Sequence, residues 1–474
     1  MLVAIIVTFI VGYACIALEH PLKVSKTATA LLLGVLVWTM YAMSMNTFGE
    51  GMSVEQWREQ LSGSLVHHLG STAETVFFLL GAMTIVTLVD SYQGFRIITD
   101  RITTTNRRQL LWILSIITFF LSALLDNMTT AIVMCALLRK LISDQKERWL
   151  FAGMIILAAN AGGAWSPIGD VTTIMLWIGG QVTTINIIVK TIVASLVCLI
   201  VPVAILSMTM KGEIERPKVD ENEQNEIPAK LRNLIFWLGI GGLLFVPIFK
   251  SITHLPPYLG MLFSLAVLWV ITEIMSHRSL KKPDGNSKLP TVMSTLTVID
   301  TPSILFFLGI LMAVAGLESC GILAMLSNGL SETFLDVEIA GHAAGFFIID
   351  LIIGVLSSII DNVPLVAATM GMYPIDGSIA LDICQVNHQF WEFLEYCAGT
   401  GGSLLIIGSA AGVAVMGMEK IDFIWYVKKI SWLALLGYLA GAIVFIIMDI
   451  TLFERIPFLR DLASIAPNAL PMLA

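Results

Sequence analysis

Two Asp-Asn pairs stand inside long apolar runs of this 474-residue chain. Asp126-Asn127, followed by Thr129 and Thr130, interrupts residues 109–138, and Asp361-Asn362 interrupts residues 340–373. An ionised carboxylate near the centre of a bilayer costs roughly 2.5 to 3.5 kcal/mol even on a lenient insertion scale. Carboxylate, amide and hydroxyl oxygens are also the ligands that small hard cations prefer. The two pairs therefore predict a buried site for a cation or a proton.

A second kind of interruption follows each Asp-Asn pair. Residues 160–173 and 399–412 are rich in glycine and small polar residues, and Pro167 stands in the first of them. These residues should unwind the helix, and irregular backbone at membrane depth is tolerated only where it is buried in protein or lines a cavity. The predicted cation- or proton-binding residues are Asp126, Asn127, Thr129, Thr130, Asn160, Ser166, Asp170, Thr172, Thr173, Asp361, Asn362, Thr400, Ser403 and Ser409.

Structural roles compete with binding for some of these residues. A threonine in a helix often donates to a carbonyl of its own helix. Gly162-Gly163 and Gly401-Gly402 could serve only to let helices pack closely. An aspartate at a hairpin tip is a good helix N-cap, a role that is compatible with ion binding.

Composition places the chain in a membrane. It is 57% hydrophobic and 13% charged, with a mean hydropathy of +0.85, whereas soluble chains average about 25% charged residues. The formal charge of −8 is concentrated in short connections, and no basic stripe indicates nucleic acid. The six cysteines form no Cys-x-x-Cys pair, so we expect neither a disulfide framework nor a cysteine metal site.

Apolar runs predict ten spans, at residues 2–18, 28–44, 74–91, 150–180, 185–209, 233–250, 257–275, 302–318, 391–417 and 430–450. The first lacks a basic start, so we interpret it as a retained span and not a cleaved signal. Residues 50–70 are too polar to span, and we expect an interfacial helix there. Basic residues flank both ends of 109–138 and acidic residues flank 340–373, which predicts two re-entrant hairpins that enter from opposite sides. Loop charges, including Lys23 and Lys26, put both termini on the non-cytoplasmic side.

The pairing of motifs indicates an internal repeat. Residues 1–210 would form the first half (hairpin 109–138, broken span 150–180) and residues 231–450 the second (hairpin 340–373, broken span 391–417). Residues 211–230 would be a polar cytoplasmic linker and 451–474 a C-terminal tail. Five spans per half is an odd number, so the halves must be inverted relative to each other. The predicted fold is an all-α polytopic membrane protein with inverted five-span repeats, each with a re-entrant helical hairpin and an interrupted transmembrane helix.

These motifs, together with Gly-Asp-Val-Thr-Thr at 169–173, resemble those of the NhaD-type sodium/proton antiporters of the ion-transporter superfamily over essentially the whole chain. The resemblance implies a bacterial inner-membrane antiporter that exchanges Na⁺ and also Li⁺ for H⁺. It implies a homodimer built on a scaffold part, a mobile transport part, and no cofactor. Asp126, Asp170 and Asp361 would then hold Na⁺. Relatives that carry dicarboxylates have Ser where this chain has the tip Asp, which favours a cation over an anion.

Burial disfavours the ionised form of a carboxylic acid, so these acids could hold either a proton or Na⁺. We predict exchange by competition for shared carboxylates, with Glu74 as a candidate for a proton path. The alternative on the same scaffold is a Na⁺-coupled transporter of an anion or organic acid. It would require a cationic residue in the site, and neither hairpin nor broken span contains Lys or Arg between its flanking charges. An enzyme is disfavoured because no catalytic motif is present, and saturable, ΔpH-coupled flux would exclude a channel.

Overall fold

The structure is a computed structural model, and it describes residues 1–49, 51–99, 102–215, 227–280, 289–339, 342–377 and 381–453. Most of the predicted linker at 211–230 and nearly all of the predicted tail at 451–474 lie outside these ranges. The chain forms an all-α polytopic membrane protein, in which one pair of two-residue strands, β1 (Glu338–Ile339) and β2 (His342–Ala343), is the regular β-structure that the described ranges contain.

The helices of the first part are α1 (Leu2–Ala17), α2 (Glu19–Leu22), α3 (Lys26–Ala42), α4 (Met45–Phe48), α5 (Val54–Ser91), α6 (Arg96–Thr99), α7 (Arg107–Leu125), α8 (Asn127–Leu141), α9 (Gln145–Gly163), α10 (Val171–Ile178) and α11 (Thr184–Thr209). Those of the second part are α12 (Ala229–Thr253), α13 (Pro257–Leu280), α14 (Val292–Leu296), α15 (Thr301–Ser319), α16 (Ile322–Phe334), α17 (Gly345–Leu356), α18 (Asn362–Met372), α19 (Gln389–Gly401), α20 (Ala410–Glu419), α21 (Phe423–Tyr426) and α22 (Trp432–Met448). Two π-helical turns, η1 (Val427–Ser431) and η2 (Asp449–Phe453), flank α22.

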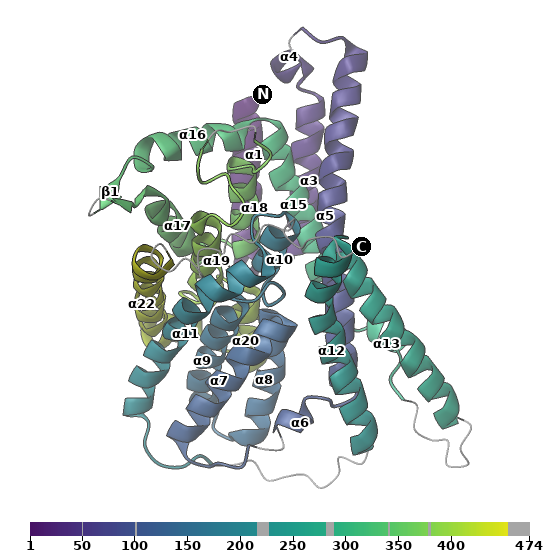
Figure 1. The fold of residues 1–474 in the computed structure, drawn as a ribbon, viewed down its shortest axis with the longest axis vertical. Coiled ribbons are helices and arrows are strands. Elements are labelled where there is room, and N and C mark those ends of the chain that lie inside the picture. Colours follow the sequence, from purple (N-terminus) through teal and green to yellow (C-terminus); the bar gives the residue numbers. More distant parts are fainter. Residues whose placement is uncertain are drawn as a thin grey trace.

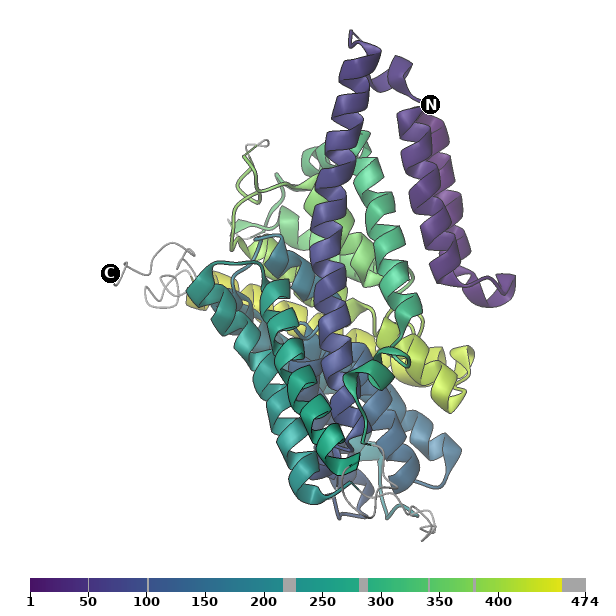
Figure 2. The ribbon, with the colours of Figure 1, turned by 90° about the vertical axis from the view of Figure 1, so that its right-hand side faces the viewer.

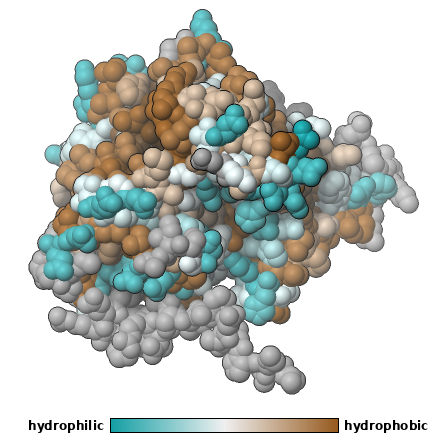
Figure 3. Space-filling model, turned by 90° about the horizontal axis from the view of Figure 1, so that it is seen from above, coloured by the Kyte–Doolittle hydropathy of each residue, from teal (hydrophilic) through white to brown (hydrophobic). Residues whose placement is uncertain are grey.

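Seven helices in the described ranges are long and apolar enough to cross a membrane, and α1 and α3 are shorter apolar helices. Large apolar side chains are exposed on the outer helices α12 and α13, including Trp237, Ile248, Phe263 and Val270. A continuous exposed apolar surface of this kind suits lipid contact. The end of the molecule seen from above mixes hydrophilic with hydrophobic residues (Figure 3).

The prediction of a separate interfacial helix at residues 50–70 is wrong. These residues begin α5, which runs unbroken over 38 residues from Val54 to Ser91. Ser53 and Gln56 form a capping box at its start, and Trp57 is buried against Tyr41 with ring centroids 5.2 Å apart. Because no proline interrupts this stretch and its first turn is well capped, the polar segment continues the apolar one as a single helix.

Both hairpins predicted from the Asp-Asn pairs are present. The α7–α8 hairpin occupies the lower half of the molecule and the α17–α18 hairpin the upper half, so they approach each other from opposite ends (Figure 1). Each of the two predicted broken spans is also interrupted, between α9 and α10 and between α19 and α20. This opposite approach is the geometry that inverted halves would give.

Equivalent contacts fix each hairpin against its broken span. Ser122 Oγ donates to the Ala159 carbonyl at 2.6 Å, and Ser357 Oγ donates to the Ala398 carbonyl at 2.7 Å. A Cβ on Gly162 would collide with the backbone of α7, and one on Gly401 would collide with the backbone of α17. The glycine pairs therefore do permit close helix packing, the structural role considered for them above.

Charges at the base of the first hairpin also have a structural use. Arg139 Nε and Arg148 Nε lie 2.7 Å and 2.9 Å from the two carboxylate oxygens of Glu419, whose side chain is 1% exposed. Glu419 ends α20, so Arg139 of the hairpin helix α8 and Arg148 of α9 both join the first half to the second broken span. Two of the basic residues from which the membrane topology was predicted, Arg139 and Arg148, thus neutralise a buried acid.

The turn between α1 and α3 lies near mid-height of the molecule (Figure 2). Helix α3 packs along α15, and α15 packs against α18 of the second hairpin. Lys26, the first residue of α3, is thereby brought to the tip of that hairpin, where its side chain is 22% exposed. Packing of α3 on α15 thus leaves Lys26 partly buried, and the side of the membrane that it faces stays a prediction.

Candidate ion site

Asp170 lies where the two hairpin tips meet. It caps the N-terminus of α10, with its Oδ1 accepting from the Thr172 N–H at 3.3 Å, and it is 1% exposed. Asn127 Nδ2, from the first tip, donates to Asp170 Oδ2 at 2.6 Å. Asn362 Nδ2, from the second tip, lies 3.4 Å from both carboxylate oxygens. One carboxylate therefore joins the amides of both halves.

A buried polar layer continues from Asp170 into the second broken span. Asn160 accepts from Asn127 Nδ2 at 3.2 Å through its Oδ1. Its own amide donates to Ser403 Oγ at 2.8 Å and to Ser409 Oγ at 3.0 Å. All four side chains are less than 5% exposed. These residues, predicted separately in two halves, form one network.

Glu395 belongs to this site and was missed in the sequence. It lies on α19 with 0% exposure, and its Oε1 accepts from Thr172 Oγ1 at 3.0 Å and Thr173 Oγ1 at 2.7 Å. Its Oε2 has no hydrogen-bond partner in the described residues. The signal was a Glu-x-x-Glu pair, Glu392 and Glu395, inside an apolar run, but the repeat gives no acid at the matching place in the first half.

The first tip holds Asp126 in a strained conformation. Its φ of 126° and ψ of 157° fall in a region that is nearly restricted to glycine. Its carboxylate caps α8, with Oδ1 accepting from the Thr129 N–H at 2.7 Å and Oδ2 from Thr129 Oγ1 at 2.6 Å. Asp126 is partly exposed, and none of the ion pairs within the described residues involves it. The N-cap role considered for it is therefore present.

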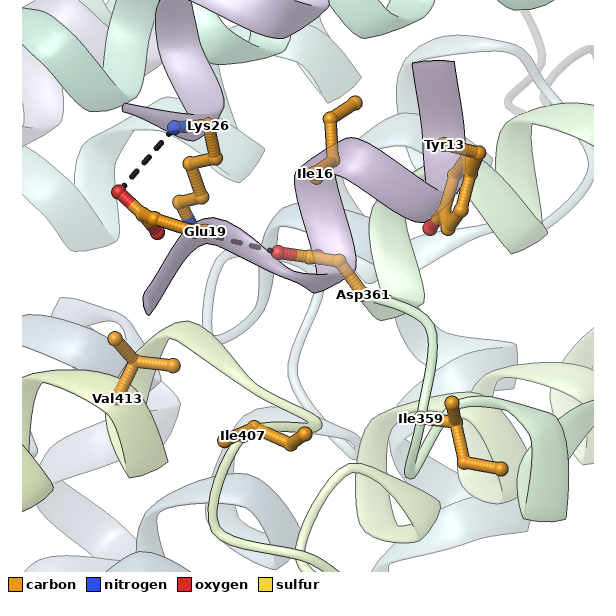
Figure 4. A pocket seen from close by; sticks show the side chains of 8 residues that line it. All are labelled: Tyr13, Ile16, Glu19, Lys26, Ile359, Asp361, Ile407 and Val413. Atoms are coloured by element: carbon orange, nitrogen blue, oxygen red, sulfur yellow. Dashed lines mark hydrogen bonds and ion pairs between the residues drawn. The ribbon is translucent and has the colours of Figure 1, made fainter. Parts of the chain in front are cut away.

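The second tip pairs Asp361 with a cation from the N-terminal helices. Lys26 Nζ lies 3.6 Å from Asp361 Oδ2 and 4.5 Å from the centre of the Phe306 ring. The Lys26 N–H donates to Glu19 Oε1 at 3.2 Å, and these side chains line a small cavity at the tip (Figure 4). Asp361 also caps α18 through the Val363 N–H at 3.3 Å. A basic residue thus reaches the site although neither hairpin contains one.

Three further predicted residues make no hydrogen bond to the Asp170 network in the described residues. Ser166 Oγ donates to the Ala123 carbonyl at 2.5 Å, which ties the first broken span to its hairpin. Thr400 Oγ1 donates to the Tyr396 carbonyl one turn earlier at 2.5 Å, the helix-internal bond considered above. Thr130 is buried, and its Oγ1 has no hydrogen-bond partner among the described residues.

Glu74 lies outside this network, in a larger cavity of about 720 Å³ on α5. The ends of α10 and α18 line the same cavity, together with Glu318, His67 and Asp376. Because α10 and α18 begin at Asp170 and Asp361 respectively, this cavity lies at the far ends of helices that start in the site. It is an acidic vestibule from which cations could reach the bundle interior.

The three tip and break carboxylates do not converge on one point. Asp126 and Asp361 are turned toward the helices that they cap, and Asp170 is held by amides. Within the part of the chain that the structure describes, no three His, Cys, Asp or Glu side chains come close enough to hold one metal ion. The site is the buried carboxylate of Asp170, surrounded by amide and hydroxyl groups, with the buried Glu395 beside it and a charged residue at each tip.

Opposed helical hairpins, broken helices and a shared polar site between them define a polytopic secondary transporter. A sequence profile described as "Citrate transporter" (CitMHS) matches residues 13–391. The chain is 44% identical to sodium/proton antiporter 1 of Arabidopsis thaliana over 96% of this chain and 75% of that protein. It is 42% identical to sodium/proton antiporter 2 of the same plant, over 92% and 97%. It is 29% identical to the Na⁺/H⁺ antiporter NhaD of Alkalimonas amylolytica, over 95% and 91%. The chain belongs to the citrate transporter family and is similar to NhaD-type antiporters.

Proposed function

We propose that this protein exchanges Na⁺ for H⁺ across a membrane. The observation that carries the proposal is Asp170, a carboxylate with 1% exposure at the meeting point of both hairpins. Among the described residues no Lys or Arg pairs with it, and its direct donors are neutral amides. A buried carboxylate without a counter-charge is strongly disfavoured, so a bound cation or a proton must compensate it. The names of the similar antiporters agree with this pair of substrates.

Exchange follows from competition for that negative charge. Na⁺ binds when the carboxylate is ionised, and a proton binds when Na⁺ has left, because holding both would add excess positive charge in a buried place. Glu395 lies beside Asp170 through Thr172 and Thr173 and adds a further acid to the site. Asp126, at the first tip, caps α8 and adds a negative potential near Asp170 that attracts cations.

Finer features of the proposal come from the family resemblance. We propose Li⁺ as a second transported cation and a homodimer as the assembly. Residence in a bacterial inner membrane stays a prediction, because the similar antiporters come from both plants and bacteria. Function as a transporter and not as an enzyme agrees with the family.

Transport of an organic acid is the second candidate, because the family profile is described as a citrate transporter. Lys26 could attract an anion, as that alternative requires. However, Lys26 lies 3.6 Å from Asp361, whose carboxylate balances its charge. The remaining acids at the site, Asp126, Asp170 and Glu395, would repel a carboxylate substrate.

The experiment uses the purified full chain in proteoliposomes that contain a pH-sensitive dye. We expect NaCl and LiCl, but not choline chloride, to change the internal pH in the direction of cation/proton exchange. The apparent KM for Na⁺ should fall as the pH rises, because fewer protons then compete for the carboxylate. Asp170→Asn is the matched inactive control. Uptake of labelled citrate driven by Na⁺, without any Na⁺-dependent pH change, would instead establish the organic-acid function.

A further inference from the structure

A second group of buried charges, on α11, α17 and α19, lies beside the ion site. Asp350 on α17 and Glu392 on α19 are both 0% exposed, and their four carboxylate oxygens lack hydrogen-bond partners in the described residues. Lys190 on α11 is 6% exposed, and its Nζ lies 4.0 Å from Glu392 Oε2. None of these three residues is among the predicted site residues. We call these three residues the α17–α19 cluster.

Charge balance requires a proton in this cluster. Two ionised carboxylates and one ammonium would leave a net negative charge in a buried place, where each uncompensated ion is disfavoured by several kcal/mol. Because α17 packs along α19 and both side chains are buried, the like charges of Asp350 and Glu392 repel each other. A proton on either carboxyl group removes one of the two negative charges and therefore that repulsion.

Ionisable side chains reach α19 from several packed elements. Helices α9, α10 and α18 pack against α19 but place no ionisable side chain next to the cluster. Helix α9 carries no ionisable residue after Arg148, and neither α10 nor α18 carries any. The ionisable groups on the other packed segments and on α19 itself are Asp350, Lys190, Cys198, Tyr373, Tyr438, Asp449, His388, Glu395, Tyr396 and Cys397. Carboxylates therefore outnumber the cationic groups around the cluster.

A cavity lies at the start of α19, next to the helical turn that carries Glu392. It has a volume of about 310 Å³, and its polar lining includes His388, Gln389, Asp382 and Asp449. His388 caps α19, so Glu392 lies in the first turn of the helix that begins at this cavity. The charges of Asp449 and Glu392 interact, as do those of Lys190 and His388. Water in the cavity is thus within about one helical turn of the cluster.

The same helix leads from the cluster to the ion site. Glu395 follows Glu392 by three residues, a rise of about 4.5 Å along the axis at ~1.5 Å per residue. Glu395 contacts Thr172 and Thr173, which follow Asp170. The order along this line is cavity, cluster, Glu395 and ion site, and it is separate from the acidic vestibule at Glu74.

We propose that the α17–α19 cluster is a proton relay that exchanges protons with water in the cavity and supplies them to the ion site. A proton from water binds a carboxylate oxygen of Glu392 or Asp350. It leaves toward the ion site, and the carboxylate is restored. Lys190 balances the remaining charge. This inference rests on the proposed Na⁺/H⁺ exchange and adds a proton route distinct from the cation route.

The test compares two fluxes in the same proteoliposomes: Na⁺/H⁺ exchange by the internal dye, and ²²Na⁺/Na⁺ exchange at saturating Na⁺, which moves no net proton. Asp350→Asn and Glu392→Gln should lower Na⁺/H⁺ exchange about 100-fold, the contribution expected of a positioned proton-transfer group. ²²Na⁺/Na⁺ exchange should stay within twofold of the wild type. Ser195→Ala, a buried position on α11 with Lys190, is the control and should change neither flux.

Loss of both fluxes in a folded variant, or of neither, overturns the relay. If neither neutral variant folds, Asp350→Glu and Glu392→Asp take their place, because they keep an acid and move it. An altered ratio of the two fluxes then supports the relay, and an unaltered ratio overturns it. Absence of Na⁺/H⁺ exchange in the wild type would instead contradict the proposed function and is recognised before any variant is measured.

Discussion

The two hairpin tips share a motif and differ in charge balance. Asp126 and Asp361 each cap the second helix of their hairpin, and the following asparagine of each reaches Asp170. Asp126 has a strained backbone with a φ of 126°, and none of the ion pairs among the described residues involves it. Asp361 has an ordinary φ of −48° and lies 3.6 Å from the ammonium of Lys26.

This difference shows how a repeated motif acquires two roles. The repeat positions both tips, but the surrounding helices decide what each carboxylate faces. Asp126 keeps its negative charge available to a cation, and its backbone strain, of the order of 1 to 3 kcal/mol, is typical of functional positions. Asp361 is already paired with Lys26 of α3, whereas no ion pair is formed at Asp126 among the described residues.

The largest effect is expected where the tips converge. Asp170→Asn removes the negative charge that both tip amides contact, and two hydrogen bonds to a charged group contribute about 3 kcal/mol together. Na⁺/H⁺ exchange should fall about 100-fold. Initial rates of dye response in proteoliposomes measure this, with Asp170→Glu as a variant that keeps the charge. Wild-type rates in Asp170→Asn would contradict a shared centre.

Asp126→Asn should give the next largest effect. It keeps the N-cap geometry but removes an uncompensated charge near the site, so the apparent KM for Na⁺ should rise about tenfold. Adding Lys26→Gln should not restore the wild-type KM, because Lys26 is paired with Asp361 and that pair is intact in Asp126→Asn. Equal KM values for Asp126→Asn and the wild type would show that the first tip has only a capping role.

At the second tip, the effect should depend on Lys26. Asp361→Asn leaves the Lys26 ammonium without its partner, which should repel Na⁺ and raise the apparent KM. The double variant Lys26→Gln/Asp361→Asn should return to within about twofold of the wild type, as coupled neighbours do in a double-mutant cycle. Failure of the double variant to recover would mean that Asp361 itself binds the cation.

The smallest effects should be equal in the two halves. Ser122→Ala and Ser357→Ala each remove one hydrogen bond from a hairpin to its broken span. Each should lower the free energy of unfolding by about 1 kcal/mol, the usual value for such a bond. Thermal unfolding in detergent measures both. A clear inequality would show that the two packing contacts, although alike in geometry, differ in strength.

Much of the site could be predicted because polar residues in an apolar run have few alternatives to a protein interior. Asp126, Asp170, Asn127 and Asn362 were found in this way, and the structure brings the last three together. Glu395 was missed because the repeat has no acid at its counterpart in the first half. Asp350 was not among the predicted site residues, and it is completely buried.

The sequence alone determined the membrane class, the two hairpins and the two broken helices, because hydrophobic length and helix-breaking residues act locally. The tertiary structure decided which charges meet. Lys26 reaches Asp361 across 335 positions only because α3 packs on α15, and Glu392 meets Lys190 only because α11 packs on α19. Electrostatic pairing depends on distances of a few ångströms between remote segments, and periodicity in one segment carries no information about them.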